Sequence, residues 1–199
     1  MKIQSEKDLM KIRDEQRKSL YYPDFVKVNI GMASCGIAAG AQAAHDAAAK
    51  AFPDENGVRI SQTGCIGFCE EEPLVEILEE GKPRVIYRQV TEDKIRPVIE
   101  GYLAGKFDKK RILGQMRDPR SLLEEDFENP LSRVTPLDGI PFLEDIPFYK
   151  KQVKIALRNC GYVNPESMEE YIARDGYFGF FKALSEMQPA QTLSLIHIS

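Results

Sequence analysis

Four short segments in the first half of the chain alternate apolar and polar side chains with a period of two residues. This alternation is typical of β-strands that bury one face, and turn-forming residues bound the segments. A run containing glycine and proline separates the last two segments and favours a hairpin between them. The expected strands are residues 25–30, 58–62, 74–78 and 84–88.

Helices are predicted before, between and after these strands. Ser5 followed by Asp8 is typical of a capping box, which predicts an amphipathic helix over residues 5–19. The alanine-rich stretch 38–52 has a high helix propensity, and its small side chains would let it lie close to a sheet. A further helix is expected over about residues 91–103, beginning at a threonine N-cap and containing one proline.

The order strand, helix, strand, hairpin and helix predicts an α/β fold. The first strand–helix–strand unit favours parallel pairing through a right-handed crossover, and the hairpin adds antiparallel strands. We therefore expect a thioredoxin-like mixed four-stranded sheet with flanking helices over residues 21–104. The amphipathic helix within residues 1–20 precedes this domain.

The second half of the chain has a different character. Five prolines punctuate residues 105–150, which excludes a long helix and indicates an extended linker. Residues 151–157 alternate like a strand, a helix is expected from Pro165, and another around 177–187. The last residues fit no helical period and resemble translated vector sequence. The expected divisions are a linker over 105–150, an incomplete α/β segment over 151–191 and a non-native tail over 192–199.

Composition narrows the class of protein. Hydrophobic residues make up 43% and charged residues 29% of the 199 residues, which is typical of a globular chain. With a net charge of −4, the chain lacks the excess of basic residues that is typical of proteins that bind nucleic acid. No apolar run approaches the roughly 20 residues of a membrane span, and the charged N-terminus lacks a secretory core. These features predict a cytoplasmic protein without direct membrane insertion.

Three cysteines follow the two strands that are expected to pair in parallel. Cys35 comes after the first strand, and Cys65 and Cys69 come after the second. Loops at the carboxyl ends of neighbouring parallel strands converge, so these thiols are predicted to face one metal site. Thiolates on short glycine-containing loops suit an iron–sulfur centre. For Cys160 a buried thiol beside a turn is favoured over a fourth ligand.

Other polar and aromatic features have simpler interpretations. His45 is expected to be solvated or packed on its helix, and His197 belongs to the tail. The acidic run 70–72 is interpreted as a solvated loop, the alternative being a group that tunes a cluster's potential or attracts a positive partner. The aromatic residues within 177–181 are interpreted as the core of a domain that later sequence completes.

Two stretches carry a resemblance to a known family. The runs Cys35–Ala41 and Thr63–Glu76, with Tyr87 and Val90-Thr91 after them, resemble the thioredoxin-like [2Fe–2S] ferredoxin domain of NADH dehydrogenase and bifurcating hydrogenase flavoprotein subunits. Residues 151–189, especially 158–161, 165–173 and 182–187, resemble the opening of the flavin- and NADH-binding subunit of complex I. This order, ferredoxin-like domain and then flavoprotein, is that of the fused bacterial F-type subunit.

The resemblance implies a [2Fe–2S] cluster and a place beside other subunits of an NADH dehydrogenase or hydrogenase complex, in the cytoplasm or peripheral to a membrane complex. In the resembled subunit the FMN loop, the NAD site and the [4Fe–4S] cysteines come after the point where this sequence stops. We therefore expect the 199-residue chain by itself to have no NADH dehydrogenase activity.

One departure from the family concerns the ligands. The family's cluster takes four cysteines, and one usually stands five positions before Cys35, where this chain has Ile30. Ser34, water or an external thiolate would complete the set, or the cluster is absent. Three functions stay open: an electron-transfer module, a clusterless scaffold that docks the flavoprotein, and a thiol redox or zinc site on Cys65 and Cys69.

Overall fold

A five-stranded mixed sheet forms the centre of the molecule. The computed structural model describes residues 3–53, 57–120 and 127–196. The strand order is β2-β1-β3-β4-β5; β1 pairs with β2 in parallel, and the other neighbours are antiparallel. The strands are β1 (Val26–Gly31), β2 (Val58–Thr63), β3 (Val75–Leu78), β4 (Val85–Tyr87) and β5 (Ile112–Gln115). The α/β fold and all four predicted strands are confirmed.

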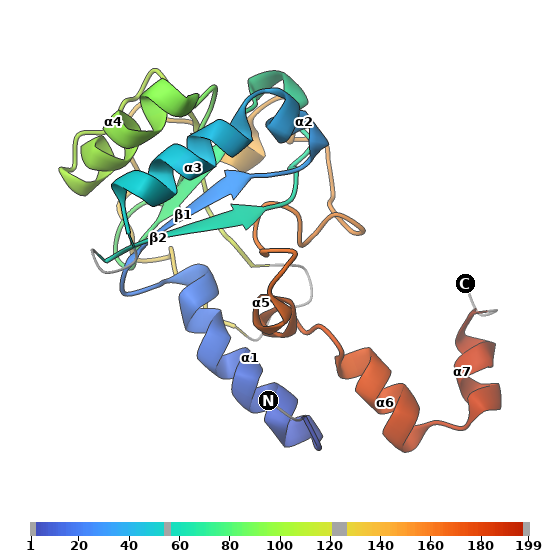
Figure 1. The fold of residues 1–199 in the computed structure, drawn as a ribbon. Coiled ribbons are helices and arrows are strands. Elements are labelled where there is room, and N and C mark those ends of the chain that lie inside the picture. The colour runs from blue at the N-terminus through green and yellow to red at the C-terminus, as the bar shows by residue number, and fades with distance from the viewer. Residues whose placement is uncertain (1–2, 54–56, 121–126, 197–199) are drawn as a thin grey trace.

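The predicted helices also form, and Figure 1 shows α3 and α4 together on one face of the sheet. In the parts of the chain that the structure describes, no helix has both the length and the apolar character needed to cross a bilayer. The helices are α1 (Glu6–Tyr21), α2 (Ser34–Ala38), α3 (Ala41–Ala51), α4 (Glu92–Leu103), α5 (Met168–Ala173), α6 (Phe178–Glu186) and α7 (Pro189–Ile196), with 3₁₀ turns at Cys69–Glu71 and Leu143–Asp145.

The capping box at the start of α1 is present. The Asp8 N–H donates to Ser5 Oγ at 3.4 Å, and the Ser5 N–H donates to Asp8 Oδ2 at 2.9 Å. These two bonds satisfy backbone donors that the first turn of a helix leaves free. The helix therefore begins at the position that the sequence predicts.

Alternate residues of β1 form the main core with the two covering helices. Val28 and Ile30 are fully buried against alanines of α3 and against Ile95 and Ile99 of α4. Ala41, Ala44 and Ala48 of α3 are also fully buried, which brings the helix backbone close to the sheet. Burying each of these branched side chains contributes about 1.5–3 kcal/mol. Ile30 is thus a core residue.

The interpretation of residues 105–150 as a linker is wrong in one part. Ile112–Gln115 forms β5 and pairs with β4, while the Gln115 N–H donates to the Pro141 carbonyl at 2.9 Å. Ile112 and Leu113 are buried, so this short apolar segment packs as part of the sheet. A four-residue strand is too short for its period to be recognised in the sequence. It is identified only by its pairing with the edge strand β4 in the structure.

Two predictions for the last fifty residues are also wrong. Residues 151–157 form turns instead of a strand, and Val153 and Ile155 are 72% and 69% exposed. Alternation alone was insufficient, because this segment pairs with no strand. Residues 192–196 are helical, since α7 begins at Pro189, a favourable first position of a helix. His197 lies outside the described residues.

The second face of the sheet is buried as well, and its polar side chains are paired. Glu76 on β3 accepts two hydrogen bonds from the Arg84 guanidinium, at 2.6 and 2.9 Å, and one from the Asn29 amide at 2.8 Å. Lys27 forms a 2.6 Å ion pair with Glu170 of α5. All six residues of β1 are therefore buried, although their sequence alternates.

The buried Glu76–Arg84 pair generates a test of the fold. Arg84 is 1% exposed, so Glu76→Ala leaves a buried guanidinium without its carboxylate. We expect the free energy of unfolding to fall by about 3–5 kcal/mol, measured by chemical denaturation. The matched control is Glu100→Ala, which breaks the exposed Arg96–Glu100 pair and is expected to cost at most about 1 kcal/mol. Equal losses in the two variants would contradict this account.

Candidate metal centre

Cys35 lies in the first turn of α2, directly after β1, and not in a loop as the sequence predicts. The helix starts so soon because residue 36 is glycine. A Cβ atom there would lie 2.2 Å from the Gly31 carbonyl oxygen, closer than any real contact. Gly36 therefore lets the turn that carries Cys35 fold back onto the end of β1.

Cys65 and Cys69 lie on the segment that follows β2. Gly67 has a φ of +93°, and its N–H donates to Cys65 Sγ at 3.2 Å. Cys69 begins the 3₁₀ turn Cys69–Glu71. A left-handed glycine thus turns the chain so that a backbone donor faces sulfur, a feature of iron–sulfur sites.

The three sulfurs converge at one end of the sheet, as the sequence predicts. Cys35 Sγ lies 3.4 Å from Cys65 Sγ, which lies 3.8 Å from Cys69 Sγ, and all three atoms are within 4.8 Å of one another. Cys35 and Cys65 are half-buried and Cys69 is exposed. Loops from two parallel strands, thirty residues apart in sequence, therefore bring these thiols to one place.

The other candidate ligands are not part of the three-sulfur group. Ile30 is fully buried in the core and Ser34 is exposed at the start of α2. Cys160 is half-buried, and its sulfur is 3.9 Å from where a Cβ on Gly64 would lie, but it is not within the three-sulfur group. His45 lies on α3 with its Nδ1 atom 3.4 Å from Asp46 Oδ1.

Glu72 belongs to the site, and sequence reasoning missed it. Its carboxylate is 7% exposed, so the interpretation of the whole acidic run as solvated is wrong at this residue. Glu72 Oε1 accepts a hydrogen bond from Cys35 Sγ at 3.7 Å, and Oε2 accepts one from the Leu74 N–H at 2.8 Å. Glu70, by contrast, is exposed, and Glu71 pairs with Arg88 at 2.9 Å. One signal in the sequence could have identified Glu72, namely its position. It shortly precedes β3, and the start of β3 lies beside the end of β1, where Cys35 follows.

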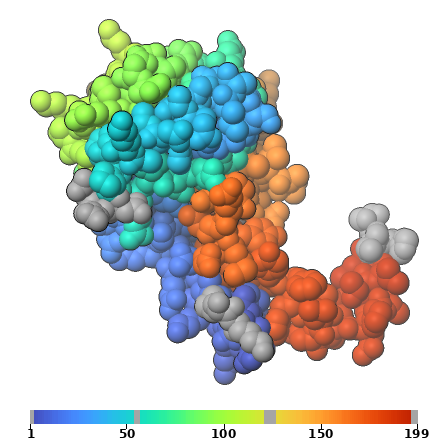
Figure 2. Space-filling view, in the orientation of Figure 1, coloured from blue at the N-terminus to red at the C-terminus, as the bar shows by residue number. Residues whose placement is uncertain are grey.

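A later part of the chain covers the second cysteine loop. Phe148 stacks on Phe68 with ring centroids 4.5 Å apart. The Tyr149 hydroxyl and the Lys154 ammonium each donate to the Ile66 carbonyl at 3.4 Å. Figure 2 shows this orange segment packed on the body of the molecule, whereas α6 and α7 project away from it. The segment therefore shields one side of the loop from water.

Burial sets the protonation of the free thiols. It raises the pKa of Cys35 to about 12, and it also raises the pKa of Cys65. The same burial lowers the pKa of the neighbouring Lys154 ammonium. Buried thiols of this kind are poor nucleophiles at neutral pH, which argues against a thiol-disulfide enzyme.

The donor set fits a metal centre with thiolate ligands. Three cysteine sulfurs are soft donors that select zinc, copper(I) or an iron–sulfur cluster over magnesium and calcium. A [2Fe–2S] cluster ordinarily takes four protein ligands, and three thiols with one adjoining carboxylate supply four donor side chains. The residues present are therefore compatible with such a cluster.

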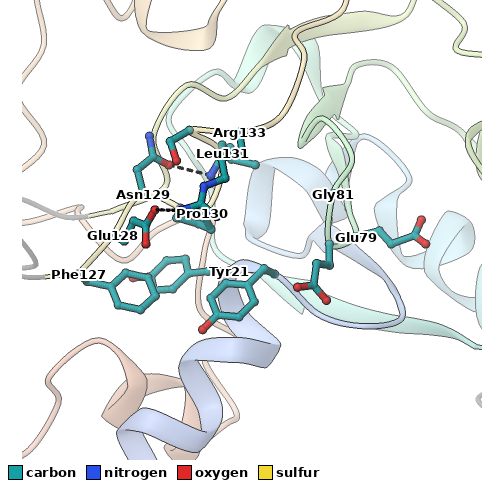
Figure 3. Close-up of a pocket in the computed structure, with 12 residues that line it drawn as sticks. Tyr21, Glu79, Gly81, Phe127, Glu128, Asn129, Pro130, Leu131 and Arg133 are labelled. Carbon is teal, nitrogen blue, oxygen red and sulfur yellow. Dashed lines mark hydrogen bonds and ion pairs between the residues drawn. The ribbon is translucent and has the colours of Figure 1, made fainter.

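A separate hollow of about 390 Å³ lies at the other end of the sheet, beside the β3–β4 turn. Figure 3 shows Tyr21 and Phe127 side by side in its wall, and their ring centroids are 5.4 Å apart. Glu79, Glu128 and Arg133 contribute charged groups. No cysteine or histidine is among its described lining residues, so it offers no soft metal ligand.

Two hydrogenase subunits are similar to this chain in sequence. The NADP-reducing hydrogenase subunit HndC of Solidesulfovibrio fructosivorans is 51% identical over 47 residues, which are 24% of this chain and 9% of that protein. Subunit HndB of the same organism is 34% identical over 82 residues, 38% of this chain and 62% of that protein. The chain thus spans less than two thirds of either relative. No protein-family model matches it.

Among solved structures, the thioredoxin-like [2Fe–2S] ferredoxin from Aquifex aeolicus is similar to part of the chain. One structure of it has a TM-score of 0.40 at 19% identity and covers 49% of this chain and 97% of that one. A structure of the wild-type protein has a TM-score of 0.39 at 18% identity and covers 46% and 99%.

The close approach at Gly36 predicts a specific defect. Gly36→Ala forces the first turn of α2 away from Gly31, so we expect a loss of about 1–3 kcal/mol in the free energy of unfolding. The control is Gly179→Ala in α6, where, apart from the adjoining residues and the backbone of the same helix, no atom lies within 4 Å of the added methyl group. That variant is expected to be as stable as the wild type or slightly more so. A Gly36→Ala chain of unchanged stability would refute the packing described.

The thiols are expected to differ in reactivity. In the metal-free, reduced chain at pH 8, iodoacetamide should modify exposed Cys69 first and Cys35 last. Because the pKa of Cys35 is raised to about 12, its thiolate fraction and labelling rate should rise about tenfold per pH unit between pH 7 and 9. Mass spectrometry of timed samples measures each site. Preferential labelling of Cys35 would contradict the burial that we describe.

Proposed function

We propose that this chain is an electron-transfer module of an NAD(P)-linked hydrogenase-type complex. The observation that carries the proposal is the convergence of Cys35, Cys65 and Cys69 within 4.8 Å of one another. Both curated relatives are subunits of an NADP-reducing hydrogenase, which supports the same class of complex. The proposed cofactor is a [2Fe–2S] cluster held by these cysteines.

A bound [2Fe–2S] cluster supplies the acceptance and release of one electron. The chain's own residues would set the conditions of that exchange. The Gly67 N–H, which donates to Cys65 Sγ, would stabilise negative charge on the ligand. The rings of Phe68 and Phe148 exclude water from one side, while exposed Cys69 leaves an edge open for a redox partner.

The finer parts of the proposal concern organisation and partners. Residues 21–104 would be the cluster-bearing domain, and the segment from 105 to 191 would join it to an NADH-oxidising flavoprotein of the F type. The partners would be other subunits of the hydrogenase complex, in the cytoplasm. Docking of the segment 148–163 on the cysteine loop supports this joining, because it packs the later sequence directly against the site.

A second candidate function is a clusterless docking scaffold. The observation that favours it is Ile30, a fully buried core residue at the position where the resembled domain has a cysteine. In that case the thioredoxin-like sheet would hold the flavoprotein segment through packing alone.

Iron and acid-labile sulfide analysis of the anaerobically purified chain separates the two candidates. We expect about two irons and two sulfides per chain for a [2Fe–2S] centre. Cys65→Ser should abolish both, because it removes the sulfur that lies closest to the other two. Cys160→Ser is the matched control and should retain both, since its sulfur is outside the group. A chain without iron after reconstitution would favour the scaffold.

A further inference from the structure

The carboxylate of Glu72 is buried beside the three sulfurs without a cationic partner. Its side chain is 7% exposed, and among the described residues no ion pair joins it to a lysine, arginine or histidine. Arg88 instead pairs with Glu71. A buried carboxylate is costly unless a cation or several hydrogen bonds compensate it, and a metal ion supplies that compensation.

The surrounding backbone is shaped to hold this carboxylate. Cβ atoms placed on Gly31 and on Gly36 would each lie 3.2 Å from Glu72 Oε2. That oxygen accepts the Leu74 N–H at 2.8 Å, which fixes the orientation of the group. Its other oxygen, Oε1, faces Cys35 Sγ at 3.7 Å. Two glycines and one backbone donor thus hold Oε2 and direct Oε1 to the Cys35 thiol.

We infer that Glu72 is the fourth protein ligand of the metal centre, in place of the cysteine that Ile30 replaces. The inference rests on the proposed function in that it assumes a metal at this site. Ile30 lies in the core and cannot reach a metal there, whereas Glu72 Oε1 lies beside Cys35. A carboxylate oxygen and three thiolates form a complete four-donor set for iron or zinc.

Two of the distances between donors agree with tetrahedral coordination. Around an ion with metal–sulfur bonds of about 2.3 Å, two sulfur ligands lie about 3.8 Å apart and a sulfur and an oxygen about 3.5 Å apart. Cys65 and Cys69 are separated by 3.8 Å, and Cys35 and Glu72 by 3.7 Å. Cys65 with Cys69, and Cys35 with Glu72, would thus be the two pairs of residues that hold the metal centre.

The test compares three full-length chains purified anaerobically and reconstituted with iron and sulfide. Wild type is compared with Glu72→Gln, which keeps the shape of the side chain and removes its charge. The matched control is Glu70→Gln, two positions away in the same acidic run and exposed to solvent. Metal retention against a chelator is measured for each. We expect Glu72→Gln to lose at least about tenfold in affinity, and Glu70→Gln to equal wild type.

A second measurement distinguishes ligation from a hydrogen bond to a cysteine ligand. In wild type labelled with ¹³C at the glutamate carboxylates, pulsed electron paramagnetic resonance of the reduced cluster should detect a carbon two bonds from iron. Glu72→Gln should lack this coupling and Glu70→Gln should keep it. The wild-type spectrum tests the inference even where the Glu72→Gln chain does not fold.

Two results would overturn the inference: unchanged metal retention in Glu72→Gln, or a reduced wild-type cluster without the ¹³C coupling. Failure of the proposed function has another signature, namely one metal ion per chain without sulfide. The ligand is then tested in the cobalt(II)-loaded chain. Glu72→Gln, but not Glu70→Gln, should shift the thiolate-to-cobalt absorption bands, and identical bands would overturn the inference on this metal too.

Discussion

The buried ion pair between Glu76 and Arg84 constrains how the rest of the chain folds. The sheet has no water-facing side at this point, so both charges must be satisfied within the protein. Glu76 also accepts from Asn29 of β1, and Arg84 donates to the Leu20 carbonyl at the end of α1. The Arg84 guanidinium lies over the Tyr162 ring, 5.2 Å from its centroid. Helix α1, strands β1 and β3, the start of β4 and the segment that contains Tyr162 are thus fixed relative to one another around one pair of charges.

The part of the fold that the sequence could predict is the side of the sheet that packs through apolar side chains alone. Valine and isoleucine at alternate positions of β1 face alanines of α3, and a periodic pattern expresses that packing directly. The other side depends on pairings such as Lys27 with Glu170, which no local pattern contains. For the same reason β5 was missed, because its four residues become a strand only beside β4.

The same distinction holds for the site: residues identified by their neighbours in sequence could be predicted, and residues identified by contacts between distant parts of the chain could not. The cysteines could be predicted to converge, because each follows a strand and the two strands are parallel neighbours. Glu72 could not be separated from Glu70 and Glu71 by charge, since all three carry the same group. Only the antiparallel pairing of β1 with β3 brings Glu72, three residues before β3, beside Cys35, where burial distinguishes it.

Residues around Val163 and Arg174 cover the second face of the sheet, and this late covering has a consequence for folding kinetics. The Thr63 hydroxyl donates to the Val163 carbonyl at 3.2 Å, and Arg174 donates to the Tyr21 hydroxyl at 2.9 Å. These contacts join residues one hundred or more positions apart, so each requires a long loop to close and pays more chain entropy than the β3–β4 hairpin does. The hairpin and the α3-covered face are expected to form early, and the wall beside the cysteines last. During synthesis the thiols are therefore expected to be accessible to metal and sulfide donors until the ribosome has added residues 148–163.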